Sequence, residues 1–102
     1  MRFSLTISIT RSHLRRGIPG NPGIDPIALA LWDIPEFAFP CIGNTGGEVV
    51  YCPEGEERRW MLMDFPFRTQ AFIVCYDATP EIVEPEELII NFRDSWEKPK
   101  IY

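Results

Sequence analysis

The chain has 102 residues, of which 45% are hydrophobic and 13% aromatic, and its net charge is −5 at neutral pH. This length fits one domain, and the apolar content is sufficient for a packed core and too high for a disordered chain. The acidic balance argues against a general nucleic-acid binder, which normally shows a basic excess. No stretch approaches the roughly 18 apolar residues that a membrane span requires, so we expect no membrane partner.

The three cysteines, Cys41, Cys52 and Cys75, lack the CxxC spacing of zinc sites and do not make an even-numbered disulfide framework. Each has apolar sequence neighbours, where a free cysteine behaves as a small core residue. Free thiols are typical of reducing compartments. We therefore expect three core cysteines, no metal, no cofactor and a location in the cytoplasm.

The first predicted element is a strand at 2–10, where polar and apolar residues alternate with a period of two. Such alternation is typical of a strand with one buried face. Thr10 or Ser12 is then suited to cap a short helical turn, which Gly17 would end.

A second helix is predicted after the loop "IPGNPG". Asp25 is a favourable N-cap, and Pro26 stands at the first helical position, where its missing N–H costs nothing. The following "IALALW" has high helix propensity, and Pro35 is expected to stop the helix. Two turns are not stable alone, so this helix must be held by packing on a sheet.

Three strands are predicted next, at 36–42, 48–52 and 58–65, with turns rich in Gly, Pro and Glu between them. They read as an antiparallel meander. Pro40 lies inside the first of these strands, and a proline there indicates an edge strand or a bulge.

The C-terminal part is predicted to contain a helix at 67–78, a loop with two prolines and a last strand at 88–92. The resulting order is β-α-β-β-β-α-β. We therefore expect a small α+β domain over 1–93, with an antiparallel or mixed sheet and two short helices packed on it, and a polar tail at 94–102.

Four segments, "ITRSHLRRG", "DPIALAL", "AFIVCYDATPEIVEP" and "LIINF", resemble a family of small uncharacterised proteins of tailed bacteriophages. That family shows a T-x-x-H-x-x-x-G pattern, a helix that opens C-P-I-A-L-A-L, a helix with F-I-x-x-Y/F-D and a final strand ending in Phe. The chain departs at Asp25, where the family usually has Cys. A capping role survives this change, whereas a thiol role would be lost. The resemblance implies a phage or prophage gene whose product binds host factors; it brings no known activity.

A basic cluster follows the first strand. Its members, which are candidate ligand-binding residues, are Arg11, His13, Arg15 and Arg16. Arginines beside a glycine-rich loop could hold a phosphate, and the alternative is a solvated turn whose arginines pair with acids elsewhere. His13 is the only histidine and therefore the one neutral-pH base. Because no cysteine stands at an exposed sharp turn, we expect no enzyme.

An acidic segment near the C-terminus is a candidate protein interface. Its members are Glu84, Glu86 and Glu87, with Asp77 and Glu81 before them. Such a set could mimic a nucleic-acid backbone for a host enzyme. The alternative is an ordinary polar loop.

Oligomerisation is also expected. If the helices cover one sheet face, the other would expose Val50, Met61 and Met63, and exposed apolar patches commonly mark interfaces. We therefore expect a homodimer or higher assembly, built on the meander 37–63 or on the tail around Trp96. A charge at either methionine should then split the assembly without unfolding the chain.

The sequence thus favours a non-enzymatic phage-type accessory protein that binds a host protein in the host cytoplasm, for example to inhibit a defence or regulatory factor. The alternative is an oligomer that captures an anionic nucleotide or another phosphorylated small molecule with the basic segment 11–16. Nucleic acid is not an expected partner in either case.

Overall fold

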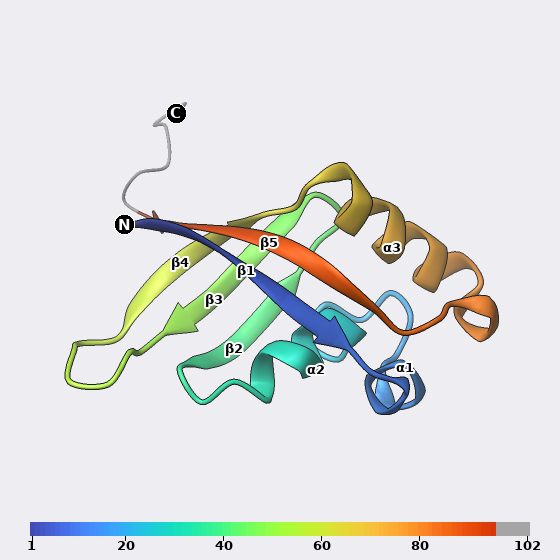
Figure 1. Cartoon of the computed structure of the whole chain (residues 1–102), viewed down its shortest axis with the longest axis horizontal. Coiled ribbons are helices and arrows are strands. Elements are labelled where there is room, and N and C mark those ends of the chain that lie inside the picture. The colour runs from blue at the N-terminus through green and yellow to red at the C-terminus, as the bar shows by residue number, and fades with distance from the viewer. Residues whose placement is uncertain (96–102) are drawn as a thin grey trace.

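The structure, a computed structural model, describes residues 1–95. It is an α+β single domain with the element order β-α-α-β-β-β-α-β, which confirms the expected class and adds one helix. The elements are β1 (Arg2–Ile9), α1 (Arg11–Arg16), α2 (Pro26–Trp32), β2 (Phe37–Ile42), β3 (Gly46–Tyr51), β4 (Arg59–Asp64), α3 (Phe67–Ala78), the 3₁₀ helix η1 (Pro80–Ile82) and β5 (Glu86–Asp94). Figure 1 shows the three α-helices gathered at one end of the strands.

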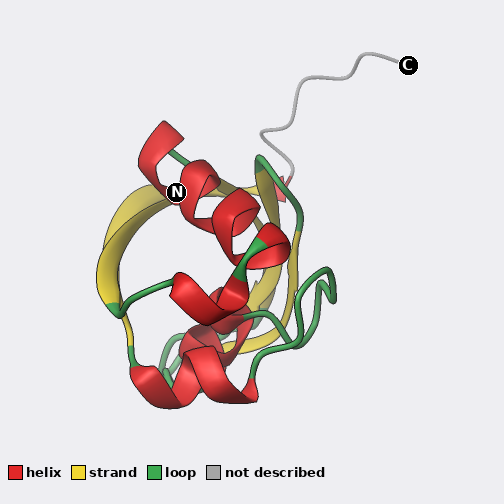
Figure 2. Ribbon diagram, turned by 90° about the vertical axis from the view of Figure 1, so that its right-hand side faces the viewer, coloured by secondary structure: helices red, strands yellow, loops and turns green. Residues whose placement is uncertain are grey.

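The five strands form one sheet in the order β1-β5-β4-β3-β2, and every neighbouring pair is antiparallel. Of the two sheet types expected, the antiparallel one is therefore correct. The sheet curls into a half-barrel, and the view in Figure 2 shows the strands as an open ring behind the helices. The helices fill the end of this ring, which makes the concave face the core.

At the end of the curled sheet away from the helices, aromatic side chains of β1 and β5 contact aromatic side chains of β2 and β3. Phe3 on β1 lies 5.2 Å from Tyr51 on β3 between ring centroids, although these strands are not neighbours in the sheet. Phe92 completes the group, stacked on Phe3 at 4.9 Å and on Phe37 at 5.1 Å. Offset aromatic pairs of this kind add about 0.5–1.5 kcal/mol each beyond their buried area.

The local sequence signals place the helices as expected. Thr10 caps α1: its hydroxyl accepts a hydrogen bond from the backbone N–H of His13. The carboxylate of Asp25 caps α2 by accepting the N–H of Ala28 at 2.9 Å, with Pro26 at the first position. α2 ends at Trp32, before Pro35 is reached.

The expectation that Val50, Met61 and Met63 face solvent is wrong. Their exposed fractions are 7%, 0% and 2%. The curl turns the methionine side of β4 toward the helices, and Val50 shares a pocket wall with Phe39 and Trp60 on the outer face. Neither methionine can therefore contact a partner in this fold. Trp96, the other apolar candidate, lies outside the described residues.

The expectation of core cysteines is also wrong, because Cys41, Cys52 and Cys75 are all exposed. Cys75 lies on the outward side of α3, whose buried side chains are Thr69, Phe72, Ile73 and Tyr76. Apolar neighbours in sequence do not specify which side of an element faces the core.

The last strand extends beyond its expected end, since β5 continues to Asp94. Asp94 is 2% exposed, and its carboxylate accepts a hydrogen bond from the N-terminal ammonium of Met1 at 2.6 Å. This hydrogen bond lowers the pKa of Asp94. The two ends of the described chain are thereby joined. Within residues 1–95, no helix is long and apolar enough to cross a membrane.

Replacing Met61 by Ala is expected to reduce the free energy of unfolding by about 2–5 kcal/mol, because the fully buried side chain would leave a cavity. Leu62→Ala is the matched control, since the neighbouring side chain lies on the outer face and is only half-buried. Urea denaturation of both variants measures the difference. Equal losses would contradict the assignment of the inner face.

Candidate interaction surfaces

Three large aromatic side chains, Trp32 on α2, Phe39 on β2 and Trp60 on β4, form an exposed apolar surface. We call Trp32, Phe39 and Trp60 the aromatic patch; their exposed fractions are 46%, 61% and 54%. The rings of Trp32 and Phe39 meet edge to face at 5.4 Å. Phe39 and Trp60 line one pocket of about 290 Å³ together with Val50. Contiguous exposed apolar surface of this kind commonly marks a contact site.

A backbone irregularity holds Phe39 outside. The register between β2 and β3 shifts between Ala38 and Cys41, and Phe39 has a φ of 52°. A bulky residue in this left-handed region is unusual and costs of the order of 1–3 kcal/mol. The result is that Phe37 points into the core, at 3% exposure, while Phe39 points outward. Both sequence interpretations of Pro40 are confirmed, because β2 is an edge strand and carries this bulge.

Two arginines border the aromatic patch, and both line the pocket beneath Trp60. Arg59 is engaged in ion pairs with Glu56 at 3.3 Å and with Asp94 at 3.5 Å. Arg58 is exposed, and residues 1–95 provide it with no ion pair. The patch therefore combines aromatic surface with an available guanidinium group.

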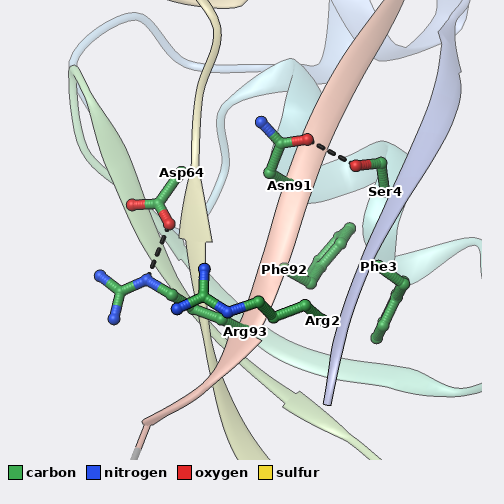
Figure 3. Close-up of a pocket in the computed structure, with 7 residues that line it drawn as sticks. All are labelled: Arg2, Phe3, Ser4, Asp64, Asn91, Phe92 and Arg93. Atoms are coloured by element: carbon green, nitrogen blue, oxygen red, sulfur yellow. Dashed lines mark hydrogen bonds and ion pairs between the residues drawn. The ribbon is translucent and has the colours of Figure 1, made fainter. Parts of the chain in front are cut away.

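A second surface is a polar groove of about 400 Å³ on the outer face, where β1, β5 and β4 adjoin (Figure 3). Its lining residues are Arg2, Phe3, Ser4, Asp64, Asn91, Phe92 and Arg93. The guanidinium of Arg93 donates from Nε to Asp64 at 2.8 Å. The hydroxyl of Ser4 donates to the side-chain oxygen of Asn91 at 2.6 Å.

The four candidate ligand-binding residues of the basic segment are not assembled into a site. Arg11 pairs with Glu84 at 2.7 Å, which favours the alternative that arginines of this turn pair with acids. Arg16 donates to the hydroxyl of Ser12. Arg15 is exposed, and the part of the chain that the structure describes gives it no hydrogen-bond or ion-pair partner.

His13 is buried rather than solvent-facing, since only 5% of its surface is exposed. Its Nδ1 accepts the backbone N–H of Thr10 at 3.0 Å, so the ring proton lies on Nε2. That nitrogen donates to the carboxylate of Asp33 at 2.6 Å. His13 therefore closes the capping box of α1 and ties this helix to the end of α2.

The acidic candidates lie at the start of β5 and just before it. Glu84 and Glu86 line an apolar groove of about 320 Å³ beside α3, and Glu86 is bound by Arg68. Glu87 is exposed. Two of the three carboxylates are thus paired with arginines of the same chain, which leaves a weaker negative surface than the sequence suggested.

The segments that carry the phage resemblance meet in space. The Tyr76 hydroxyl donates to the backbone oxygen of Leu14 at 3.1 Å, and the N–H of Gly20 donates to Asp77 at 2.9 Å. Asp25 and Asp77 line one small pocket of about 260 Å³. Burial raises the pKa of Asp25 from 3.8 to about 6 and also raises that of Tyr76.

No protein-family model, curated protein or solved structure matches this chain. Among residues 1–95, no group of three or more His, Cys, Asp or Glu side chains is arranged to hold a metal ion. The case for function therefore depends on the surfaces themselves.

Asp25→Asn is expected to remove a pH dependence of stability. The pKa of Asp25 is higher in the folded chain, so the folded state binds more protons and loses stability as the pH rises from about 4 through about 6. Asn caps a helix as well as Asp does. The variant should match the parent at pH ~4 and be more stable by about 3 kcal/mol at pH ~7.

Urea denaturation at the two pH values measures this gap, and Glu87→Gln, at an exposed acid, is the control. A gap that does not change with pH, or an Asn variant that is less stable at neutral pH, would show that the buried carboxylate does not titrate as described.

Proposed function

We propose that this chain is a non-enzymatic accessory protein of tailed-phage type that binds a host protein in the host cytoplasm and so inhibits a defence or regulatory factor. The observation that carries this proposal is the aromatic patch. Tryptophan and arginine are enriched among the residues that dominate the binding energy of protein interfaces. The patch places Trp60 beside Arg58, and Trp32 contacts Phe39 in the same patch. The phage assignment is supported by the sequence resemblance alone.

The backbone cost at Phe39 strengthens the argument for binding. An exposed aromatic ring gains nothing from solvent, and a left-handed Phe costs stability. A partner that covers the ring would recover apolar burial worth about 25 cal/mol per Å². Strain that yields no stability in the isolated chain is typical of a site of contact.

A second copy of the chain is the competing occupant. Phe39 and Trp60 lie on the meander 37–63, where a homodimer contact is expected from the sequence. The contact would use Phe39 and Trp60 rather than Met61 and Met63, because both methionines are buried. A dimer would use the same patch on both copies, so it would compete with a host protein.

The alternative function, capture of a phosphorylated small molecule by the basic segment 11–16, is less well supported at that segment. Arg11, His13 and Arg16 are engaged with neighbouring groups. Arg15 alone would offer little affinity, because one exposed ion pair contributes about 0–1 kcal/mol.

Trp60→Ala should abolish retention of the partner, because losing a central aromatic contact costs about 2 kcal/mol or more, roughly a 30-fold loss of affinity. Phe67→Ala is the matched control: Phe67 is 88% exposed on α3 and lies outside the aromatic patch. Both variants and the parent are used for affinity capture from a bacterial lysate. Retention by the parent and Phe67→Ala but not by Trp60→Ala is the expected result.

Light scattering of the purified chain distinguishes whether a host protein or a second copy of the chain covers the aromatic patch. A mass near 11.8 kDa, that of one chain, leaves the patch open for a host protein. A dimer that Trp60→Ala splits identifies a second copy instead. Equal retention by the parent and Trp60→Ala, or no retained protein at all from repeated captures, would contradict the proposed host contact.

A further inference from the structure

The pocket beneath Trp60 is lined by side chains of only two kinds, apolar ones and hydrogen-bond donors. Its lining residues are Phe39, Val50, Arg58, Arg59 and Trp60, and its volume is about 290 Å³. Arginine and tryptophan side chains donate hydrogen bonds and accept none. No carboxylate, hydroxyl or amide side chain lines this pocket, all of whose lining residues are described. A ligand that fits it therefore combines an apolar group with hydrogen-bond acceptors.

The apolar part of the pocket lies on the outer face of the meander. Val50 and Trp60 are direct cross-strand partners in the β3–β4 register, and such residues point to the same face of a sheet. Val50 is buried, whereas the rings of Phe39 and Trp60 are both more than half exposed. The two rings thus form walls and the valine forms the floor of a space that accommodates one large apolar side chain of a partner.

Arg58 provides the positive charge of the pocket that no neighbouring acid neutralises. Arg59 is already paired, with Glu56 at 3.3 Å and with Asp94 at 3.5 Å. Arg58 is exposed, and within residues 1–95 its guanidinium has neither an ion pair nor a hydrogen bond. Glu57 lines the adjoining pocket and makes no ion pair with it. The free guanidinium fork matches a carboxylate in shape and in charge.

These groups together specify the chemistry of the partner. We infer that the aromatic patch recognises an acidic peptide segment in which a carboxylate stands next to a large apolar side chain. The apolar side chain fills the space between Phe39 and Trp60, and the carboxylate binds Arg58. This inference rests on the proposed function, because it describes the surface of the protein that the patch binds.

Single-stranded nucleic acid also combines planar apolar groups with negative charge, but it fits this surface less well. Its affinity depends on several phosphates contacting Lys and Arg side chains, and the pocket has one guanidinium without a partner. Carboxylates at Asp33, next to Trp32, and at Glu57 are exposed nearby, and the chain carries a net charge of −5. A peptide segment needs only one acidic group at Arg58.

Titration of the full chain at low salt with three short peptides tests the inference. Each peptide has blocked ends and one central leucine, which is flanked by glutamates, by glutamines or by lysines. The readout is the NMR shift of the side-chain N–H groups of Trp60 and Arg58. Because the net charge of −5 attracts the lysine peptide non-specifically, a preference for glutamate reports the local site. The expected order of affinity is glutamate, then glutamine, then lysine.

Arg58→Gln is expected to weaken binding of the glutamate peptide by about two- to fivefold, the effect of one solvent-exposed ion pair. Binding of the glutamine peptide, read at Trp60, should not change. Arg15→Gln, at an exposed arginine on α1, is the matched control, since it makes the same change in net charge far from the patch in sequence. It should leave the affinity for both peptides unchanged.

Equal affinity for the glutamate and glutamine peptides, no saturable shift with either of them, or equal weakening by the two arginine variants would overturn the inference. Tighter binding of oligothymidylate than of the glutamate peptide would also overturn it and identify a nucleic-acid site. Failure here differs from failure of the proposed function. Trp60-dependent capture from a lysate without glutamate preference contradicts only the acidic specificity. Glutamate preference without any captured protein contradicts only the host contact.

Discussion

The whole arrangement depends on one close contact among the three helices at Gly17. A β-carbon at this position would stand 2.7 Å from the hydroxyl of Tyr76 on α3 and 3.0 Å from the ring of Pro26 on α2. The Tyr76 hydroxyl bonds the carbonyl of Leu14, the third residue before Gly17. Because these helices are short, none is stable alone. Their mutual contact lets them close one end of the curled sheet and bury its concave face.

The segments that resemble phage proteins supply the residues that form this helix contact. His13 closes a capping box and reaches Asp33, and Asp25 caps α2. Gly17 and Tyr76 provide the close approach. These residues build the fold, so the functional groups are better sought on the outer face. There, the aromatic patch lies apart from the polar groove that β1, β5 and β4 line, because no residue belongs to both.

The sequence predicted what depends on local chemistry and missed what depends on long-range curvature. The alternation of 2–10, the Asp25 cap and the helix at 67–78 all correspond to elements found. The alternation along β4 puts Met61 and Met63 on one side and Trp60 on the other, but a period of two is symmetric and does not say which side is inside. Only the curl of the sheet decides that. Arg2 and Arg93 are far apart in sequence, and strand register brings them together. Pro40 was the one local signal near the aromatic patch, since it marked the bulge that turns Phe39 outward.

The central claim is that the motif residues hold the helices together, and the free energy of unfolding of Gly17→Ala tests it most directly. Gly17 has a φ of −67°, which alanine also adopts, so the substitution reports crowding at the helix contact rather than backbone strain. Gly23→Ala is the control, because its nearest neighbour would be 3.8 Å away. The account predicts a loss of about 1–3 kcal/mol for Gly17→Ala and no loss for Gly23→Ala. A Gly17→Ala variant as stable as the parent would contradict it.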